Sequence, residues 1–349
     1  MVTLIINDRS VTVPKGTTIL QAARGIGIDI PTFCYDKDLT VFGGCRICVV
    51  EVEGSRTLTA SCATAASDGM VVLTESPKVV EARRNILELL LANHPLDCLT
   101  CEKAGKCKLQ EYSYRYEVKG TLFEKVAGNI PIDSENPCYE RDMNKCILCG
   151  KCIRVCKEVQ VSYVLNFAGR GAETKAIPAF DMPISTENCR LCGQCVEMCP
   201  TGAIIHKQLK GSRSWEVEKV RTTCPFCGTG CNFDLNVKDG KVIGVTATDE
   251  AVVNGRSLCV KGRYHADFMY SPERITTPLI KKNGKFAEAT WEEALDLVAS
   301  RFKEIKENFG PNALAGLSSA RCVNEDNYIF QKLFRASIGT NNIDHCART

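Results

Sequence analysis

The sequence contains no apolar run long enough to cross a membrane, and it does not begin with the basic and apolar segments of a signal peptide. It also has no glycine-rich dinucleotide-binding fingerprint after a strand. Lysine and arginine do not form the basic stripe that marks a nucleic-acid-binding surface. We therefore expect a cytoplasmic protein that contacts neither a membrane nor nucleic acid and that does not itself bind NAD(P).

Cysteine, in contrast, is abundant, with 22 among 349 residues. A secreted protein would use so many cysteines in disulfides, but cysteines grouped two residues apart in a cytosolic chain indicate metal binding. The formal net charge of +3 counts these thiols as neutral. Five bound clusters would change it to about −6, because each cluster with its thiolates is anionic. Most of the cysteines fall into five groups, and these groups define the expected domains.

The densest group lies in the middle of the chain. Residues 146–156 and 189–199 each read C-x2-C-x2-C-x3-C, with 32 residues between them. In iron–sulfur runs of this form, the fourth cysteine ligates the cluster of the other run. Structural zinc is less favoured, because its ligands usually come in pairs separated by longer spacers. We expect two [4Fe–4S] cubes, the first held by Cys146, Cys149, Cys152 and Cys199 and the second by Cys189, Cys192, Cys195 and Cys156.

A small β-rich domain is expected over residues 1–75. Two alternating segments flank Asn7-Asp8, which predicts a hairpin, and Thr17 is expected to cap a helix. Four cysteines follow, and Gly43-Gly44 lets backbone amides approach the sulfurs of a cluster. The tetrad resembles the [2Fe–2S] domain of the large complex I iron–sulfur subunit, of iron-only hydrogenases and of some formate dehydrogenases, which implies a β-grasp fold. The implied ligands are Cys34, Cys45, Cys48 and Cys62, and the alternative is a loop with incidental thiols.

A helix that starts at Ser76-Pro77, with serine as N-cap and proline in the first turn, leads to the next group. A C-x2-C-x5-C set here lacks a fourth thiolate, and the histidine just before it completes the tetrad. The set resembles the histidine-ligated [4Fe–4S] domain of the same three families, and a zinc site is the alternative. The implied ligands are His94, Cys98, Cys101 and Cys107.

Between this set and the central runs, the sequence carries no further ligand pattern. Tyr112, Tyr114 and Tyr116 are expected to pack between cluster domains. Cys138 matches no tetrad and is expected to be a buried or incidental thiol.

The chemistry changes near residue 224. Cysteines spaced C-x2-C-x3-C-x27-C enclose two alternating segments around Asp239-Gly240, which predict a β-hairpin. The pattern resembles the N-terminal cluster domain of molybdopterin oxidoreductases, and the implied [4Fe–4S] ligands are Cys224, Cys227, Cys231 and Cys259. The resemblance also places Lys261 between this cluster and the pterin, on the electron path. The alternative for Lys261 is a solvated surface lysine.

Residues 276–349 look like the start of an α/β domain. Amphipathic periodicity predicts helices over residues 291–308 and 325–338, and a short apolar run predicts a strand over residues 313–317. The segments 318–327 and 340–348 resemble the catalytic subunit of formate dehydrogenases.

That resemblance has implications for single residues. Arg321 is expected to contact the pterin cofactor, and Cys322 and Cys346 are expected to be pocket thiols that ligate no cluster. Thr349 would directly precede the selenocysteine or cysteine that ligates molybdenum or tungsten. We accordingly expect an in-frame UGA codon for selenocysteine at position 350, which the nucleotide sequence past Thr349 would test.

In chain order, these groups predict a multidomain α+β protein. The expected domains are a [2Fe–2S] domain at residues 1–75, a histidine-ligated [4Fe–4S] domain at 76–130, a two-cluster ferredoxin domain at 131–215, a pterin-oxidoreductase [4Fe–4S] domain at 216–275 and the start of an α/β pterin-binding domain at 276–349.

The combined resemblance favours the catalytic subunit of a formate dehydrogenase. It implies one [2Fe–2S] cluster, four [4Fe–4S] clusters and a molybdenum or tungsten bis-molybdopterin guanine dinucleotide in the full-length enzyme. Partners would be flavin subunits that handle NAD(P) or ferredoxin, or a hydrogenase. The alternative is a non-catalytic electron-transfer subunit of a hydrogenase, diaphorase or complex I-like assembly.

Overall fold

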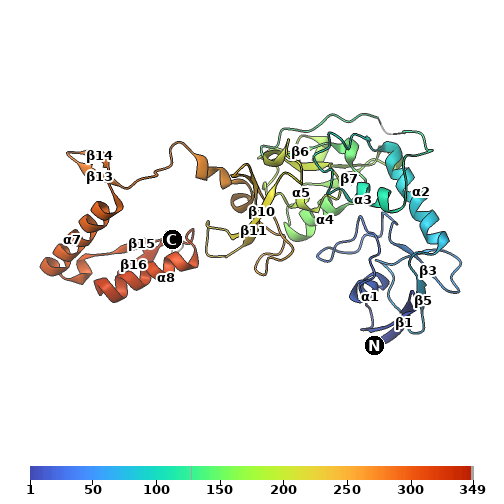
Figure 1. Cartoon of the computed structure of the whole chain (residues 1–349), viewed down its shortest axis with the longest axis horizontal. Coiled ribbons are helices and arrows are strands. Elements are labelled where there is room, and N and C mark those ends of the chain that lie inside the picture. The colour runs from blue at the N-terminus through green and yellow to red at the C-terminus, as the bar shows by residue number, and fades with distance from the viewer. Residues whose placement is uncertain (127, 347–349) are drawn as a thin grey trace. The chain divides into compact units, whose positions relative to one another are not determined.

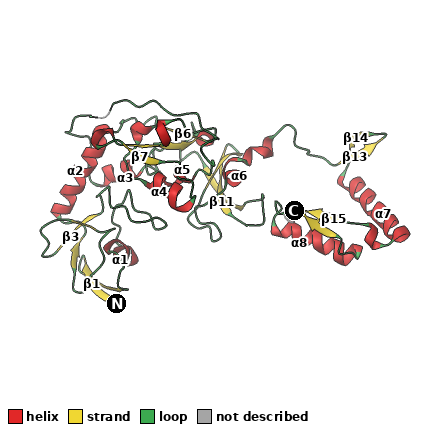
Figure 2. Cartoon of the chain, turned by 180° about the vertical axis from the view of Figure 1, so that it is seen from behind, coloured by secondary structure: helices red, strands yellow, loops and turns green. Residues whose placement is uncertain are grey.

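The computed structural model describes residues 1–126 and 128–346 and divides into two compact units, residues 1–218 and 219–349 (Figure 1). Each unit combines helices with small sheets, as the colours of Figure 2 show. Thr349, the residue expected to precede a metal ligand, lies outside the described residues. In the described part of the chain, no helix is both long and apolar enough to cross a membrane.

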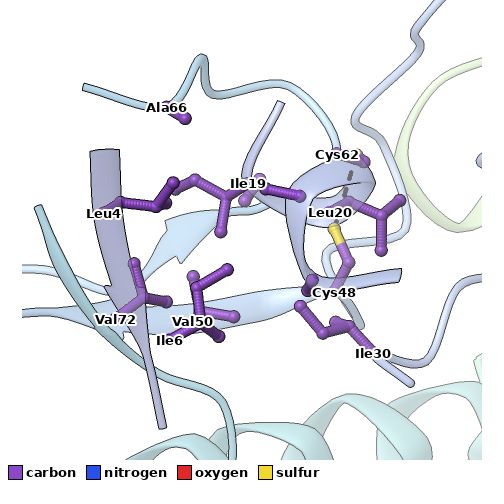
Figure 3. Close-up of a cluster of buried hydrophobic side chains, with 13 residues drawn as sticks. Leu4, Ile6, Ile19, Leu20, Ile30, Cys48, Val50, Cys62, Ala66 and Val72 are labelled. Atoms are coloured by element: carbon purple, nitrogen blue, oxygen red, sulfur yellow. Dashed lines mark hydrogen bonds between the residues drawn. The ribbon is translucent and has the colours of Figure 1, made fainter. Parts of the chain in front are cut away.

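The first unit begins with a small sheet and one helix. The strands are β1 (Val2–Ile6), β2 (Arg9–Val13), β3 (Val49–Val52), β4 (Thr59–Ala60) and β5 (Val71–Leu73), in the order β2-β1-β5-β3-β4. Helix α1 (Ile19–Gly25) buries its apolar face in the same core as the sheet, with Leu4, Ile6, Leu20 and Val72 among the fully buried residues (Figure 3).

For this domain, the predicted hairpin turn at Asn7-Asp8 is confirmed, and the predicted helix cap is wrong by one residue. Asn7 and Asp8 both take positive φ, 45° and 66°, which closes the predicted hairpin as a tight two-residue turn. The cap of α1 is Thr18 rather than Thr17. Its hydroxyl accepts from the backbone of Gln21, and the Gln21 side chain accepts from the backbone of Thr18, so the two form a capping box.

Two helices follow the sheet. Helix α2 (Pro77–Asn93) begins at the predicted Ser76 cap, and α3 (Lys108–Arg115) follows the second cysteine group. Tyr112 and Tyr116 are buried as expected, but Tyr114 is 77% exposed, because it lies on the solvent side of α3. For Tyr114 the packing prediction is therefore wrong.

The region of the two central cysteine runs is built from short elements. Strand β6 (Tyr139–Arg141) pairs antiparallel with β9 (Ile204–His206), and β7 (Asn166–Ala168) pairs antiparallel with β8 (Lys175–Ile177). The helices are α4 (Lys151–Arg154), which continues as a π-helical turn (Val155–Val159), and α5 (Gln194–Met198). Short 3-10 turns occur at Met143–Lys145, Gly171–Glu173, Ala179–Asp181 and Lys207–Leu209. Helices α4 and α5 contact each other, so the helical ends of the two runs lie side by side.

The second unit opens with a three-stranded sheet of β10 (Glu218–Thr223), β11 (Asn232–Lys238) and β12 (Lys241–Thr246). Strands β11 and β12 are antiparallel, and Asp239 and Gly240 take φ of 50° and 74° at the predicted hairpin turn. Helix α6 (Val260–Tyr264) follows and contacts β12, and a 3-10 turn covers Ala266–Tyr270.

The rest of the second unit has a hairpin, two long helices and one pair of parallel strands. The hairpin is β13 (Leu279–Lys282) with β14 (Lys285–Glu288), and the parallel strands are β15 (Gly316–Ser318) and β16 (Ile343–His345). The helices are α7 (Trp291–Phe309) and α8 (Asn324–Lys332), the latter continuing as a π-helical turn (Leu333–Ile338).

One expectation for this segment needs correction. The strand predicted over residues 313–317 starts later, because Pro311–Ala313 forms a 3-10 turn with proline at its start. Helix α7 begins where predicted, but its apolar face is poorly covered. Leu295 is 60% exposed and Val298 is 49% exposed, and the buried core here contains only Leu314, Phe334 and Ile338 among the described residues.

Candidate metal centres and cofactor pocket

The four cysteines of the N-terminal domain come together at the edge of its core. Cys34, Cys48 and Cys62 are buried, and the Sγ atoms of Cys48 and Cys62 lie 3.4 Å apart (Figure 3). Hydrogen bonds from the Cys45 and Cys62 thiols lower the pKa of Cys34 to about 2, whereas donation to Cys34 raises the pKa of Cys45. Thiols that share protons at this range are placed to bind a metal group as thiolates.

The loop before Cys45 contains the two glycines that the sequence singled out. Gly43 has a φ of 65°, in the left-handed region, and a Cβ on Gly44 would collide with the ring of Phe42. The backbone N–H of Gly44 donates to the Cys34 thiol and helps to lower its pKa. The structure therefore places a backbone amide against a candidate ligand, as glycine at this position allows.

The second candidate set consists of His94 and three cysteines that follow it in the chain. The Nδ1 atom of His94 is buried and finds no hydrogen-bond partner among the described residues, and burial lowers the pKa of the ring, which favours the neutral imidazole that ligates metals. Cys101 and Cys107 are buried and Cys98 is exposed. Burial raises the pKa of both Cys98 and Cys107, and the charge of a Cys101 thiolate raises both further. A buried imidazole nitrogen without a hydrogen-bond partner, four residues before the first of three cysteines, fits a cluster ligand.

Two residues that the sequence analysis did not single out border this set. A Cβ built on Gly202 would lie 2.9 Å from Cys101 Sγ, so only glycine leaves room for the thiol there. Lys145 Nζ lies 3.0 Å from Asp97 Oδ2 and 3.4 Å from Asp142 Oδ2. Burial lowers the pKa of Lys145, but the hydrogen bond with Asp97 and attraction to Cys101 raise it above its usual value. No spacing pattern in the sequence indicates where this lysine points.

The two central runs have the same backbone geometry. Leu148 and Leu191 take φ of 53° and 55°, and the glycines two residues later take 68° and 69°. In each run the left-handed leucine donates its N–H over 3.4 Å to the Sγ of the first cysteine, Cys146 or Cys189. The repeat in sequence is therefore also a repeat in structure, with an amide aimed at the equivalent thiol in each half.

The fourth cysteine of each run faces the other run. Burial and the charge of Cys199 raise the pKa of Cys146 to about 11 and that of Cys149 to about 12. One cavity is lined by the first three cysteines of the first run together with Cys199, and apolar side chains such as Leu165 and Ile204 complete its wall. In the other set, burial and the charges of Cys192, Cys189 and Cys156 raise the pKa of Cys195. The structure thus places Cys199 with the first run and brings Cys156 within electrostatic range of Cys195, and the crossed ligation itself stays a prediction.

Cys138 lies close to the second of these sets. Burial and the charge of Cys189 raise its pKa, and its neighbour Tyr139 places its hydroxyl 3.3 Å from Cys189 Sγ. The sequence analysis missed Tyr139, which is 1% exposed and lies within hydrogen-bond range of a candidate ligand. Among the residues that the structure describes, no group of three or more His, Cys, Asp or Glu side chains converges closely enough to hold a single metal ion. A cube makes a different demand, since its four thiolates bind four different irons.

The last tetrad lies between β10 and α6. The backbone N–H of Cys224 donates to the carbonyl of Cys231 over 2.8 Å, and the charges of Cys231, Cys259 and Cys227 add to burial in raising the pKa of Cys224. Lys261 follows Cys259 in the first turn of α6 and is exposed. Hydrogen bonding to Thr229 and the charge of Lys261 lower the pKa of Cys227. The structure thus brings Lys261 into electrostatic range of the tetrad.

The candidate pterin residues gather at the carboxyl ends of the parallel strands β15 and β16. The Cys346 thiol lies 3.2 Å from the Ser319 hydroxyl, and this contact, with help from the Ala320 backbone and the Arg321 charge, lowers the pKa of Cys346. Arg321 is exposed on the same loop and Cys322 is half-buried. Ligands of open α/β sheets bind outside the carboxyl ends of the strands, so this edge is the candidate position for a cofactor.

Asn324, which the sequence analysis did not single out as a site residue, joins this loop to the tetrad. Its Nδ2 donates to the carbonyl of Gly228 over 2.8 Å, between the candidate ligands Cys227 and Cys231. A Cβ on Gly228 would lie 2.6 Å from Asn324 Oδ1. The cluster loop and the strand-edge loop are therefore in direct contact within the second unit.

Gly228→Ala is expected to break this contact and to destabilise the second unit by about 1 kcal/mol, the usual net value of one hydrogen bond. Hydrogen exchange of the amides in residues 225–231 and 319–324 of the full-length protein would measure the loss as faster exchange in both loops. The matched control is Asn324→Ala, which already lacks the hydrogen bond. In the N324A protein, adding G228A should lower the stability of the second unit by almost nothing. An equal loss of stability with and without N324A would contradict the contact.

Models of five protein families match this chain. In chain order, they are described as 2Fe-2S iron-sulfur cluster binding domain (residues 1–77), NADH-ubiquinone oxidoreductase-G iron-sulfur binding region (83–121), 4Fe-4S dicluster domain (145–203), molybdopterin oxidoreductase Fe4S4 domain (217–271) and molybdopterin oxidoreductase (274–349). The chain is thus a multidomain iron–sulfur protein with the domain types of an oxidoreductase.

Curated relatives match the chain over its whole length. The NADPH-Fe(3+) oxidoreductase subunit alpha of Geobacter sulfurreducens is 40% identical over 100% of this chain and 40% of its own length. A subunit of an NADH-quinone oxidoreductase of Rhizobium meliloti is 39% identical over 100% of this chain and 40% of its own. A Bacillus subtilis protein named "Putative formate dehydrogenase YrhE" is 35% identical over 95% of this chain and 38% of its own. The chain spans about two fifths of the length of these relatives.

One solved structure is similar over part of the chain. A chain in the crystal structure of an NAD+-reducing [NiFe]-hydrogenase in the H2-reduced state aligns with a TM-score of 0.56 and 31% identity. The alignment covers 60% of this chain and 89% of that chain.

Proposed function

We propose that this chain, which belongs with the iron–sulfur subunits related to NADH-quinone oxidoreductases and with the molybdopterin oxidoreductases, conducts electrons between a molybdenum- or tungsten-pterin centre and a partner subunit. The observation that carries the proposal is a contact within the second unit. Asn324, from the loop at the carboxyl end of β15, donates a hydrogen bond to Gly228, which lies among the cysteines of the tetrad of residues 224–259. This contact suits electron exchange between a cofactor at the strand edge and the tetrad.

The proposed ligands are His94 and 19 of the 22 cysteines, all but Cys138, Cys322 and Cys346. When bound, the clusters pass single electrons and the metal–pterin centre supplies two-electron chemistry. Hydrogen bonding to Thr229 and the charge of Lys261 lower the pKa of Cys227, and the same cation would offset negative charge on a reduced cluster bound there. Arg321, exposed on the strand-edge loop, is proposed to bind an anionic group of the pterin cofactor. Partner subunits would handle flavin and NAD(P) or ferredoxin.

We further propose formate as the substrate. The segments 318–327 and 340–348 of the sequence resemble formate dehydrogenases, and a relative from Bacillus subtilis is named "Putative formate dehydrogenase YrhE". Oxidation of formate to CO2 releases two electrons and one proton. The electrons would leave singly through the tetrad beside Lys261, and the direction of the net reaction follows from the potentials of the partners.

A second function is favoured by a different observation. Relatives named as NADPH-Fe(3+) and NADH-quinone oxidoreductase subunits are 40% and 39% identical over the whole chain, against 35% for the relative named as a formate dehydrogenase. By this alternative, the chain is an electron-transfer subunit that oxidises no substrate of its own.

Metal analysis and formate oxidation by the full-length protein in its native complex distinguish the two. We expect molybdenum or tungsten, a pterin, and reduction of a viologen dye by formate, with acetate as the control carboxylate that has no formyl hydrogen. Metal and pterin without formate oxidation would contradict formate as the substrate. A full iron content with no molybdenum, tungsten or pterin would contradict the proposed enzyme and support the electron-transfer subunit.

A further inference from the structure

We propose that Lys145 is a positioning residue that raises the reduction potential of the cluster held by His94, Cys98, Cys101 and Cys107. The inference rests on the proposed function in one respect, namely that this set binds a cluster. It goes beyond that function because Lys145 belongs, by sequence position, to the neighbouring run: it directly precedes Cys146.

The backbone and the side chain of Lys145 serve different sets. Its carbonyl accepts a hydrogen bond from Thr201 Oγ1 over 2.7 Å, and that hydroxyl lies 3.8 Å from Cys199 Sγ, a candidate ligand of the first cube. Its side chain instead reaches Asp97, the residue before Cys98, at 3.0 Å. The ammonium is therefore directed to the histidine-containing set and away from the run in which Lys145 lies.

Two features hold the side chain there. Asp97 and Asp142 both lie within 3.4 Å of Nζ, so the ammonium has two carboxylate partners. The aliphatic stem packs over Gly202, where a Cβ would lie 3.4 Å from Lys145 Cδ and 2.9 Å from Cys101 Sγ. The stem and the Cys101 thiol thus share the space that glycine leaves open, and the side chain of Lys145 is only 15% exposed.

The effect on a cluster follows from charge. Reduction adds one electron, delivered by a neighbouring cluster, and no bond to a ligand is made or broken. A cation fixed in a poorly solvated position stabilises the more negative, reduced form and so raises the reduction potential, whereas a solvated lysine would be screened. An imidazole ligand acts in the same direction, since it leaves the cluster less negative than a fourth thiolate would. Lys145 and His94 would therefore make this cluster easier to reduce than an all-cysteine cube.

The test is an EPR-monitored redox titration, with dithionite as reductant, of the full-length protein. The signal of this cluster is the one that changes in His94→Cys. In Lys145→Met its midpoint should shift to a more negative potential at unchanged iron content, and Lys145→Arg should restore most of the shift. The matched control is Lys210→Met, because Lys210 also pairs with a carboxylate, Glu140 at 2.9 Å, but its side chain is 51% exposed and its charge is therefore screened by solvent.

The outcomes separate this inference from the function on which it rests. An unshifted midpoint in K145M with full iron content would overturn the role of Lys145 and leave the cluster assignment intact. A protein with no signal that responds to H94C would overturn the cluster itself. If K145M fails to assemble, Lys145→Gln provides the second measurement. Glutamine is polar and uncharged, so it removes only the cation beside Asp97; the midpoint should again become more negative, and an unshifted midpoint would overturn the proposal.

Discussion

Replacing Cys199 with serine is expected to remove the cube of the first cysteine run, although Cys199 lies in the second. Its charge acts on Cys146 and Cys149, and it lines the same cavity as these two thiols. The loss should be about four irons per chain, the content of one cube. Iron analysis and EPR of the reduced full-length protein would measure it.

The comparison that decides the assignment uses single serine variants from both runs. The spectrum of Cys199→Ser should match that of Cys149→Ser, and Cys156→Ser should match Cys192→Ser. The control is Cys138→Ser, which should lose no iron, because Cys138 lies near Cys189 but has no place in either set. If C199S instead matches C192S, each run holds its own cube and the crossed arrangement is wrong.

Arg83→Met is expected to destabilise the first unit by about 3 kcal/mol, the scale of removing one partner from a buried charged network. Arg83 is fully buried and donates to the carbonyls of Ile47 and Val49 at 3.1 and 2.8 Å, on either side of the candidate ligand Cys48. It also bonds Tyr116 at 2.6 Å and Glu75 at 2.8 Å. Methionine would fill much of the volume but remove the guanidinium that donates to the carbonyls of Ile47 and Val49.

The estimate lies at the low end of the usual range because Glu75 is not stranded. Its carboxylate is 41% exposed and keeps an ion pair with Arg115 at 3.1 Å. The urea midpoint of the full-length protein, followed by far-UV circular dichroism, would measure the change, and the [2Fe–2S] absorption should bleach at lower urea than in the unmodified protein. The neighbouring Arg84→Met is the control. Arg84 is 47% exposed, so its loss should cost no more than about 1 kcal/mol. Equal costs for R83M and R84M would contradict the role assigned to Arg83.

The position of Arg83 in the sequence already indicates that its side chain faces the core. Helix α2 buries Val79, Arg83, Leu87 and Leu91, which are spaced four residues apart on one face. A charge in such a stripe predicts either a break in the apolar face or a buried cation. Arg83 is a buried cation, because α2 packs against the segment around Cys48 and that segment supplies the carbonyls that accept its hydrogen bonds.

Local signals predicted what depends on near neighbours in the chain. The Asn7-Asp8 and Asp239-Gly240 turns and the Ser76 cap lie where expected, because turn and cap geometry involve only a few adjacent residues. The failures are of two kinds. The shift from Thr17 to Thr18 arose because both threonines are suitable caps, and only Thr18 is three residues before Gln21. Tyr114 is more exposed than expected, since burial depends on what packs against a helix.

Residue spacing along the chain predicted the candidate cluster sites, because the ligands in each run are two or three residues apart and little folding is needed to bring them together. Spacing together with resemblance to known families predicted the domain types, and the family matches agree with iron–sulfur and molybdopterin oxidoreductase domains. The surroundings of those sites came from the folded chain. The ammonium of Lys145 beside Asp97, the amide of Asn324 on Gly228 and the guanidinium of Arg83 on Val49 join residues 34 to 96 positions apart. Such contacts depend on how whole helices and strands pack, and the spacing of residues along the chain does not predict them.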